Sequence, residues 1–162
     1  MGKTLKFGCL LLCFSSTALA DDSLLRIHGV PVECINQAAL TYFVPAKIII
    51  SVLTVEGGEP GMASPNHNGT FDYGPMQINS IWLSKVAPYG YTKAQIQYDP
   101  CVNVMVGTWI LSGKIAATVA DNGKNYWTGV AGYHSLTPDL NSRYQNKVLT
   151  NYRLLSELLS EK

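Results

Sequence analysis

An apolar segment that ends in a single acidic residue is the feature that most constrains this fold. Pro45 suits the first turn of a helix, and residues 46–56 (AKIIISVLTVE) are apolar on almost every side. A helix that is apolar all round is buried in a protein core, and a run of about eight to ten apolar residues is too short to cross a membrane. We therefore expect a buried central helix over residues 45–57, with Glu56 at its end.

Glu56 shares a face of this helix with Ile49, Val52 and Leu53. Partial burial on that face raises the pKa of a carboxyl group, and the negative end of the helix dipole acts in the same direction. Cleavage of a glycosidic bond needs a carboxylic acid that stays protonated near neutral pH. The alternative is a Glu at a frayed helix end that points into water, and this pattern alone does not separate the two.

A second group of polar residues follows a loop rich in Gly and Pro at 57–69. Residues 69–74 (GTFDYG) predict a small β-hairpin, with residues 76–79 as its return. Asp72 is the candidate second acid, because two carboxylates across a cleft are typical of glycoside hydrolases. Its alternative is a local hydrogen bond in a turn. Gln77 and Asn79 are candidates for binding sugar hydroxyl or acetamide groups, or else they satisfy backbone groups of the hairpin.

The rest of the chain is predicted to be mostly helical. Apolar periodicity and capping residues favour helices at 32–43, 81–87, 93–98, 101–118, 126–133 and 138–160, and a turn at 122–123. The fold class is therefore mainly α, with one lobe of helices around the central helix and a small β-hairpin. The last helix carries a leucine cluster, Leu154, Leu155, Leu158 and Leu159, for which we expect core packing; docking on a partner is the alternative.

The N-terminus has the pattern of a secretory signal peptide. Lys3 and Lys6 precede an apolar stretch at 7–14, and Ala18-Leu19-Ala20 forms a small-x-small cleavage site. We expect residues 1–20 to be removed and residues 21–162 to form one domain in the periplasm, with no stable membrane span. The alternative is an uncleaved anchor.

Two cysteines remain after such a cleavage, Cys34 and Cys101. An even pair in an exported protein predicts a disulfide, which would contribute about 4 kcal/mol on the loop-entropy model. Two buried free thiols are the alternative. The three histidines, His28, His67 and His134, are far apart in the sequence and no CxxC motif occurs, so we expect no metal site.

Composition excludes other classes of protein. Charged residues make up 14% of the 162 residues and apolar ones 47%, which is typical of a folded domain rather than a disordered chain. The formal net charge of +1 gives no case for nucleic-acid binding.

Several short motifs, spread in order over residues 32–135, carry a resemblance to a known family. They are Val55-Glu56-Gly57, 66–70 (NHNGT), 72–80 (DYGPMQINS), Trp82-Leu83, Asp99-Pro100-Cys101, 107–111 (GTWIL) and Gly132-Tyr133. Together they resemble the catalytic core of the lysozyme-like superfamily. The similarity is greatest to the SLT-domain lytic transglycosylases that accompany type IV secretion, conjugation and type III secretion systems (the VirB1-like group). The run 72–80 also resembles C-type lysozyme, whose second acid occupies the place of Asp72.

The resemblance implies a lysozyme-like α+β fold and a peptidoglycan substrate. Its catalytic Glu matches Glu56, and its substrate contacts match Met76, Gln77 and Tyr133. The implied reaction cleaves the β-1,4 bond between N-acetylmuramic acid (MurNAc) and N-acetylglucosamine (GlcNAc) and forms 1,6-anhydroMurNAc, without a cofactor. Glycan strands and components of a secretion or conjugation apparatus are the implied partners. A hydrolytic muramidase and a non-catalytic peptidoglycan-binding module are the alternatives.

Three residues depart from the family pattern. Gly57 stands where Ser usually follows the catalytic Glu, Pro75 replaces Leu, and His134 replaces Asn. The loss of Ser removes a hydrogen bond expected near the acid. His134 is a candidate substrate contact that could also add a pH dependence.

Overall fold

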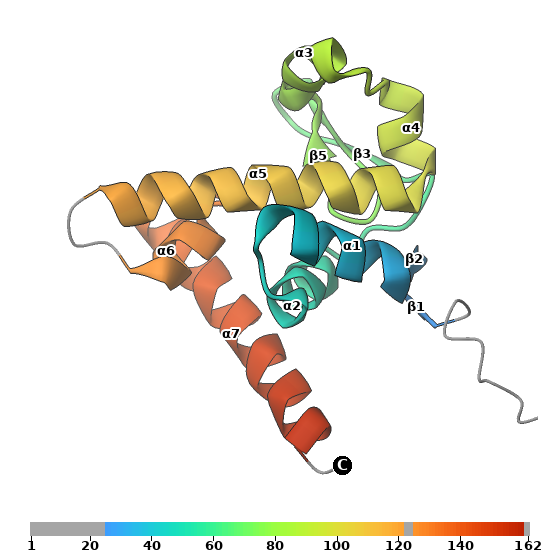
Figure 1. Cartoon of the computed structure of the whole chain (residues 1–162). Helices are drawn as coiled ribbons and strands as arrows, with labels where there is room; N and C mark the ends of the chain where they lie inside the picture. The colour runs from blue at the N-terminus through green and yellow to red at the C-terminus, as the bar shows by residue number, and fades with distance from the viewer. Residues whose placement is uncertain (1–24, 122–124, 161–162) are drawn as a thin grey trace, which may run out of the picture.

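The computed structural model describes residues 25–121 and 125–160 of the chain (Figure 1). The signal peptide predicted at 1–20 and the turn predicted at 122–123 lie outside the described residues. The mainly helical class with a small β element is confirmed. The elements are β1 (Arg26–Ile27), β2 (Val30–Pro31), α1 (Val32–Tyr42), α2 (Ala46–Glu56), β3 (Ala63–Pro65), β4 (Phe71–Tyr73), β5 (Ile78–Asn79), η2 (Ser80–Trp82), α3 (Leu83–Val86), η3 (Ala87–Tyr89), α4 (Lys93–Tyr98), α5 (Pro100–Ala120), α6 (Tyr126–Ala131) and α7 (Pro138–Ser160).

The longest core helix, α5, lies between two groups of elements. Figure 1 shows β3, β5, α3 and α4 on one side of α5, and α2, α6 and α7 on the other. Its start is capped by Asp99, whose carboxylate accepts hydrogen bonds from the N–H groups of Cys101 and Val102 (2.9 and 3.1 Å). The sequence predicted residues 45–57 as the central helix. In the structure α5 packs on α1, α4 and α6, while α2 is buried between α1 and α7.

Helix α5 is also long and apolar enough to cross a membrane, judged by length and composition alone. Half of its apolar stretch is buried within the fold. The buried side chains include Val104, Ile110 and Leu111, which belong to the same core as α2. Core helices of folded domains often have this composition.

The β element is larger than predicted. Strands β3, β4 and β5 form an antiparallel sheet in which Asp72 pairs with Ser64 on one side and Asn79 on the other. The sequence predicted residues 57–69 as loop, which is wrong for β3. This strand is three residues long and ends in Pro65, so it lacks the local pattern of a strand and is defined by its pairing with β4.

A second small hairpin precedes α1. Strands β1 and β2 pair across His28 and Gly29, whose φ values are +49° and +72°. Positive φ at both central residues is typical of the tightest hairpin turns. The disulfide between Cys34 and Cys101 is confirmed and joins α1 to the first turn of α5, with 5.2 Å between the Cα atoms.

A fully buried asparagine on α5 fixes the turn that follows β4. The Asn103 Oδ1 atom accepts a hydrogen bond from the Met76 N–H (2.8 Å), and its Nδ2 donates to the carbonyl oxygens of Tyr73 (2.9 Å) and Ile96 (2.8 Å). Since all three partners are backbone groups, this side chain ties α5 to the sheet and to α4.

The C-terminal helix α7 is only partly covered by the fold. Tyr144 and Val148 are buried, but Leu154, Leu158 and Leu159 are 52, 64 and 58% exposed. Core packing, which the sequence predicted for this leucine cluster, is therefore wrong for these three residues. They lie beyond the part of α7 that packs against the core, and Leu155 is half-buried.

Candidate active site

Glu56 is the last residue of α2, and the glycines after it turn the chain sharply. Gly57 has a φ of +63°, and its N–H donates to the Leu53 carbonyl oxygen (2.9 Å). A Cβ atom on Gly58 would lie 2.2 Å from the Gly74 carbonyl oxygen. Gly57, which replaces the family's Ser, therefore ends the helix in a conformation that favours glycine. Gly58 allows the loop to lie directly against the turn that carries Gln77.

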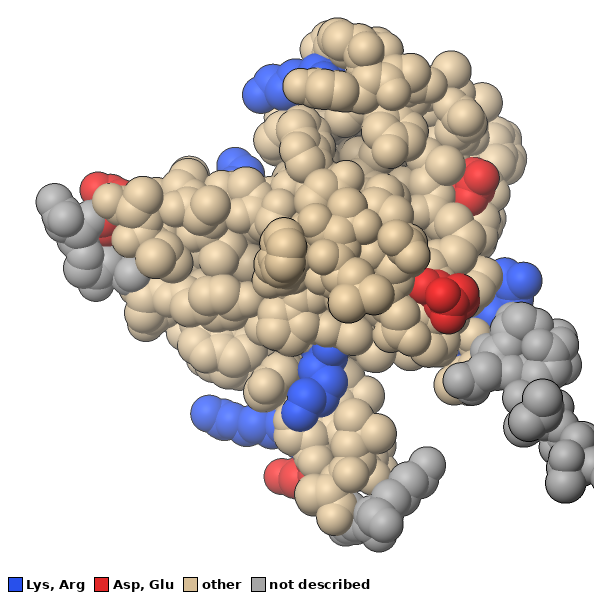
Figure 2. All heavy atoms as spheres, viewed as in Figure 1, with Lys and Arg blue, Asp and Glu red and all other residues tan. Residues whose placement is uncertain are grey.

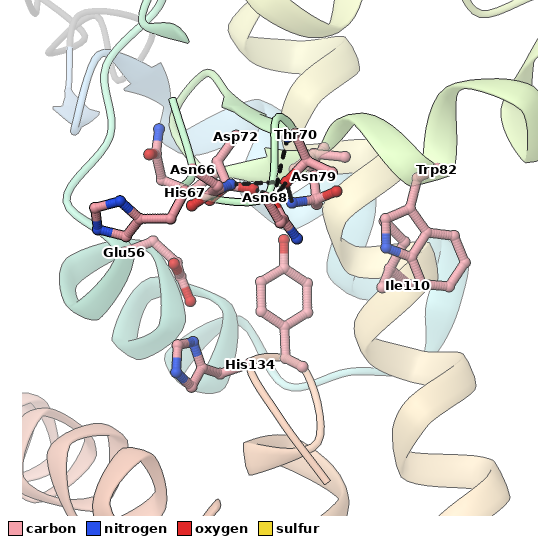
Figure 3. A pocket seen from close by; sticks show the side chains of 13 residues that line it. Glu56, Asn66, His67, Asn68, Thr70, Asp72, Asn79, Trp82, Ile110 and His134 are labelled. Atoms are coloured by element: carbon pink, nitrogen blue, oxygen red, sulfur yellow. Dashed lines mark hydrogen bonds between the residues drawn. The ribbon is translucent and has the colours of Figure 1, made fainter. Parts of the chain in front are cut away.

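The carboxyl group of Glu56 faces a cavity of about 480 Å³ (Figure 3). This volume is within the usual range for a ligand site. The lining residues come from α2, the sheet, η2, α5 and the segment after α6: Glu56, Asn66, His67, Asn68, Thr70, Asp72, Gln77, Ile78, Asn79, Trp82, Ile110, Tyr133 and His134. All the predicted site residues except Met76 line this cavity, which we call the cleft.

The environment of Glu56 favours its protonated form. Its pKa is raised to about 7, chiefly because burial penalises the charged carboxylate. The negative charge of Asp72 raises the pKa further, while the hydrogen bond from Tyr144 and the positive charge of Lys147 lower it. The group thus has the acidity of a general acid working near neutral pH.

Tyr144 contacts the acid directly, and the sequence did not identify it as a site residue. Its hydroxyl group donates a hydrogen bond to Oε1 of Glu56, and its ring stacks on that of His134 with 4.9 Å between centroids and 5° between planes. The periodicity that predicted a helix at 138–160 gave Tyr144 no role in the site. A buried tyrosine hydroxyl needs a partner, but the partner lies 88 residues away in the chain.

Asp72 lines the cleft and is held by its neighbours. Its Oδ1 accepts from the Asn79 amide (2.7 Å), and its Oδ2 accepts from the Asn66 amide (3.0 Å). Both amides also donate to the Thr70 hydroxyl oxygen (3.0 and 3.1 Å). Both interpretations from the sequence therefore describe part of the geometry, since Asp72 is locally hydrogen-bonded and also faces the cavity that contains Glu56.

Met76 contributes to the cleft through its backbone rather than its side chain. The side chain is fully buried, and a Cβ atom on Gly107 would lie 2.3 Å from its sulfur. Its carbonyl oxygen accepts a hydrogen bond from the Tyr133 hydroxyl (2.8 Å). The sequence predicted Met76 as a substrate contact, whereas its side chain lies in the core. Met76 fills the space above a glycine of α5 and positions Tyr133 on the cleft wall.

Gln77 and Tyr133 are rigidly placed on this wall. Gln77 adopts a positive φ of 47°, uncommon for a residue with a side chain, and its Nε2 donates to the Gly74 carbonyl oxygen (2.8 Å). Burial, and then the charges of Glu56 and Asp72, raise the pKa of Tyr133 well above its ordinary value. Its phenol group is therefore neutral at physiological pH and acts only through hydrogen bonding.

An aromatic side chain bounds the far part of the cleft. Trp82 packs edge-on against Trp109 of α5, with 5.9 Å between ring centroids, and the Lys85 ammonium group lies 4.5 Å from the Trp82 ring centroid. Trp82 belongs to the Trp82-Leu83 motif, but nothing in the surrounding sequence indicated that it would line the site.

Figure 2 shows Lys and Arg side chains scattered over the visible face, apart from a small group near α7. Within residues 25–121 and 125–160, no group of three or more His, Cys, Asp or Glu side chains could hold a metal ion.

Comparisons with known proteins give results consistent with this geometry. The family model described as "Transglycosylase SLT domain" matches residues 33–151. The chain is similar to "Invasion protein IagB" of Salmonella typhi, with 32% identity over 146 residues, covering 85% of this chain and 86% of that protein. It is also similar to "Protein IpgF" of Shigella flexneri, with 26% identity over 108 residues, 66% of this chain and 64% of that protein.

Proposed function

Since this chain belongs to the transglycosylase SLT domain family, a family of glycoside-cleaving enzymes acting on peptidoglycan, we propose that it is a lytic transglycosylase. It would cleave the MurNAc–GlcNAc β-1,4 bond and leave a 1,6-anhydroMurNAc end. The observation that carries the proposal is Glu56, a largely buried carboxylic acid in the cleft wall whose pKa is about 7.

In the first step Glu56 acts as general acid. It gives its proton to the glycosidic oxygen as the bond from that oxygen to C1 of MurNAc breaks, so GlcNAc leaves with a free 4-hydroxyl group. Positive charge develops at C1 and the ring oxygen. The carboxylate of Asp72 lines the same cleft and would stabilise that charge.

In the second step Glu56 acts as base. It removes the proton of the MurNAc 6-hydroxyl group while O6 bonds to C1, which closes the anhydro ring and returns the proton to Glu56. No water is consumed. Because the nucleophile is part of the substrate, proximity replaces a protein nucleophile, and one carboxyl group suffices for both proton transfers.

The hydrogen bond from Tyr144 supports this double role of Glu56. It occupies Oε1, so Oε2 is the oxygen available to exchange a proton with the substrate. A hydrogen bond to the charged form also stabilises the carboxylate that exists between the two steps. Tyr144 would therefore orient the acid and keep its pKa from rising further.

A hydrolytic muramidase is the second candidate, and the position of Asp72 is the observation that favours it. Asp72 shares the cleft with Glu56, as the second acid of a hydrolase would. However, both its carboxylate oxygens accept hydrogen bonds from Asn66 and Asn79. A hydrogen-bonded carboxylate serves in glycosidases either as nucleophile or as electrostatic stabiliser, so the reaction products decide between the two enzymes.

Two observations support a cellular role at the wall of the exporting cell. The disulfide is consistent with an exported, periplasmic protein. The similarity to a protein named for invasion supports local opening of the cell wall for a secretion or conjugation apparatus. A non-catalytic peptidoglycan-binding module is the remaining alternative. It predicts that Glu56→Gln leaves the effect of the protein on peptidoglycan the same as in the wild type.

Product analysis tests the reaction directly. Purified peptidoglycan is digested with the mature protein, the fragments are treated with borohydride, and their masses are measured. The proposal predicts fragments that are one water lighter than hydrolysis products and that borohydride does not reduce. If every new MurNAc end is reducible, the enzyme is a hydrolase and the proposal is wrong.

A further inference from the structure

A second cavity of about 260 Å³ adjoins the cleft on the side of α7. The two cavities share Glu56 and His134 in their linings, and the second is completed by Val55, Leu140, Arg143, Tyr144 and Lys147. We call it the basic cavity. Because it reaches Glu56, a group attached to the sugar beside the scissile bond can extend into it.

Two cations of α7 line the basic cavity. Arg143 and Lys147 lie four residues apart on the helix and therefore on the same face. Neither forms an ion pair with a carboxylate in the described part of the chain, and Nε of Arg143 donates to the Asp139 carbonyl oxygen (3.3 Å). Their charges are thus available to an anionic ligand, and Lys147 is close enough to influence Glu56.

The proposed substrate carries anionic groups on the same sugar whose C1 bond is cleaved. The lactyl group on O3 of MurNAc bears a peptide stem with free carboxylates. When Glu56 reaches the glycosidic oxygen of this sugar, the stem has to leave beside the ring. The basic cavity is the adjoining space, and its combination of two cations with the apolar side chains of Val55 and Leu140 is complementary to a short acidic peptide.

We propose that the basic cavity binds the peptide stem of the muramic residue in the cleft, with Arg143 and Lys147 contacting its carboxylates. This proposal rests on the proposed function, because it assumes a muramic sugar at Glu56. It makes the enzyme selective for glycan strands that still carry their stems. The other interpretation is that the two cations belong to the solvated face of an amphipathic helix and contact no substrate.

The test compares two substrates and four proteins. The substrates are intact peptidoglycan strands and the same strands after an amidase has removed the stems. The proteins are the wild type, Arg143→Gln with Lys147→Gln, Arg143→Gln alone, and Arg153→Gln. Arg153 is an exposed cation on the same helix outside the cavity lining, so it is the matched control.

The measured quantity is the ratio of kcat/KM on stem-bearing strands to kcat/KM on stripped strands. We expect a ratio of about five in the wild type and the Arg153 variant, which is the size of one or two exposed charge contacts. The double variant should bring the ratio close to one, chiefly through KM, and Arg143→Gln alone should give an intermediate value.

The ratio separates binding from other effects. Lys147 also influences the pKa of Glu56, but that effect changes both substrates equally and cancels. The rate on stripped strands shows that each variant is folded. A wild-type ratio of one, or a ratio that the double variant leaves unchanged, would overturn the stem-binding proposal. If neither substrate yields anhydro products with the wild type, it is the proposed function that fails.

Discussion

Glu56 destabilises the fold that holds it. Its pKa rises from 4.5 to about 7 on folding, so the folded state favours the protonated form. The resulting loss in free energy of unfolding is absent below pH 4.5, where Glu56 is protonated in both the folded and the unfolded state. It grows as pH rises and is complete above pH 7. Catalytic sites often carry such a cost.

We therefore predict that Glu56→Gln is more stable than the wild type at pH 8, by about 2–3 kcal/mol, and equally stable at pH 4. The amide is uncharged, and its oxygen can still accept the hydrogen bond from Tyr144. Urea unfolding at the two pH values measures the difference. Equal stability at pH 8 would mean that the carboxyl group is not desolvated.

The pH dependence of kcat/KM should follow the protonation of Glu56. A general acid must be protonated, so kcat/KM should fall as pH rises through about 7. The groups that influence this pKa are Asp72 on β4 and Tyr144 and Lys147 on α7.

Replacing Tyr144 by Phe removes a hydrogen bond that favours the charged form of Glu56. We expect the pH at which kcat/KM falls to rise by roughly one unit. We also expect the maximal rate to drop about tenfold, because the acid is less well oriented. Tyr152→Phe, on the same helix and outside the cleft lining, is the control. If kcat/KM of Tyr144→Phe instead falls at a lower pH than that of the wild type, the hydrogen bond does not favour the charged form of Glu56.

The sequence predicted the acid but not its surroundings. The end of the apolar helix made Glu56 a candidate, and the resemblance of the surrounding motifs to a known family selected it. Tyr144 could not be recognised, because its hydrogen bond joins residues 88 positions apart, and its spacing on α7 is that of an ordinary core residue. The burial of the Met76 side chain was not predicted for a similar reason, since only the packing of α5 shows that Gly107 leaves room for it.

Among the secondary structure elements, α5 and the sheet depend on one buried side chain. Asn103 makes three hydrogen bonds to backbone groups of β4, α4 and the turn after β4. We predict that Asn103→Ala lowers the free energy of unfolding by about 3 kcal/mol, because it leaves buried backbone groups without partners.

The same substitution should reduce activity, since the turn it releases carries Gln77 and the carbonyl group that holds Tyr133. Chemical unfolding and the rate of peptidoglycan cleavage measure the two effects. Asn146→Ala on the exposed face of α7 is the matched control and should change stability by less than about 0.5 kcal/mol. A loss below about 1 kcal/mol in Asn103→Ala would show that the sheet is held by other contacts.

Helices were predicted well because their signals are local. Asp99-Pro100 marked the start of α5, and Thr92 caps α4 through a hydrogen bond from the Gln95 N–H. Strand β3 was missed because two of its three residues, Ser64 and Pro65, favour turns, and only pairing with β4 makes the segment extended. Local patterns do not contain that information.

At the scale of the whole molecule, the disulfide joins α1 to α5 across 67 positions of sequence. We predict that the Cys34→Ser and Cys101→Ser double variant is less stable by about 4 kcal/mol, because the unfolded chain gains freedom when the loop is opened. Urea unfolding with and without reductant measures this. If reduction of the wild type changes nothing, the two cysteines are not bonded in the folded protein.

The overall arrangement was only partly contained in the sequence. The class, the order of helices and the pairing of Cys34 with Cys101 followed from periodicity, caps and cysteine arithmetic. The position of α5 between the two groups of elements depends on which faces pack together. The exposed leucines of α7 show the limit of such patterns, because an apolar stripe does not reveal how far along a helix the core extends.

The central claim is that Glu56 alone carries the proton in both steps. The most direct test is the rate at which anhydroMurNAc ends are released from purified peptidoglycan by Glu56→Gln, compared with Glu59→Gln, an exposed acid three residues away. We predict a loss of about a thousandfold for Glu56→Gln and a change of less than about twofold for Glu59→Gln. A Glu56→Gln rate within about tenfold of the wild type would contradict the claim, because removal of the general acid costs at least about a hundredfold.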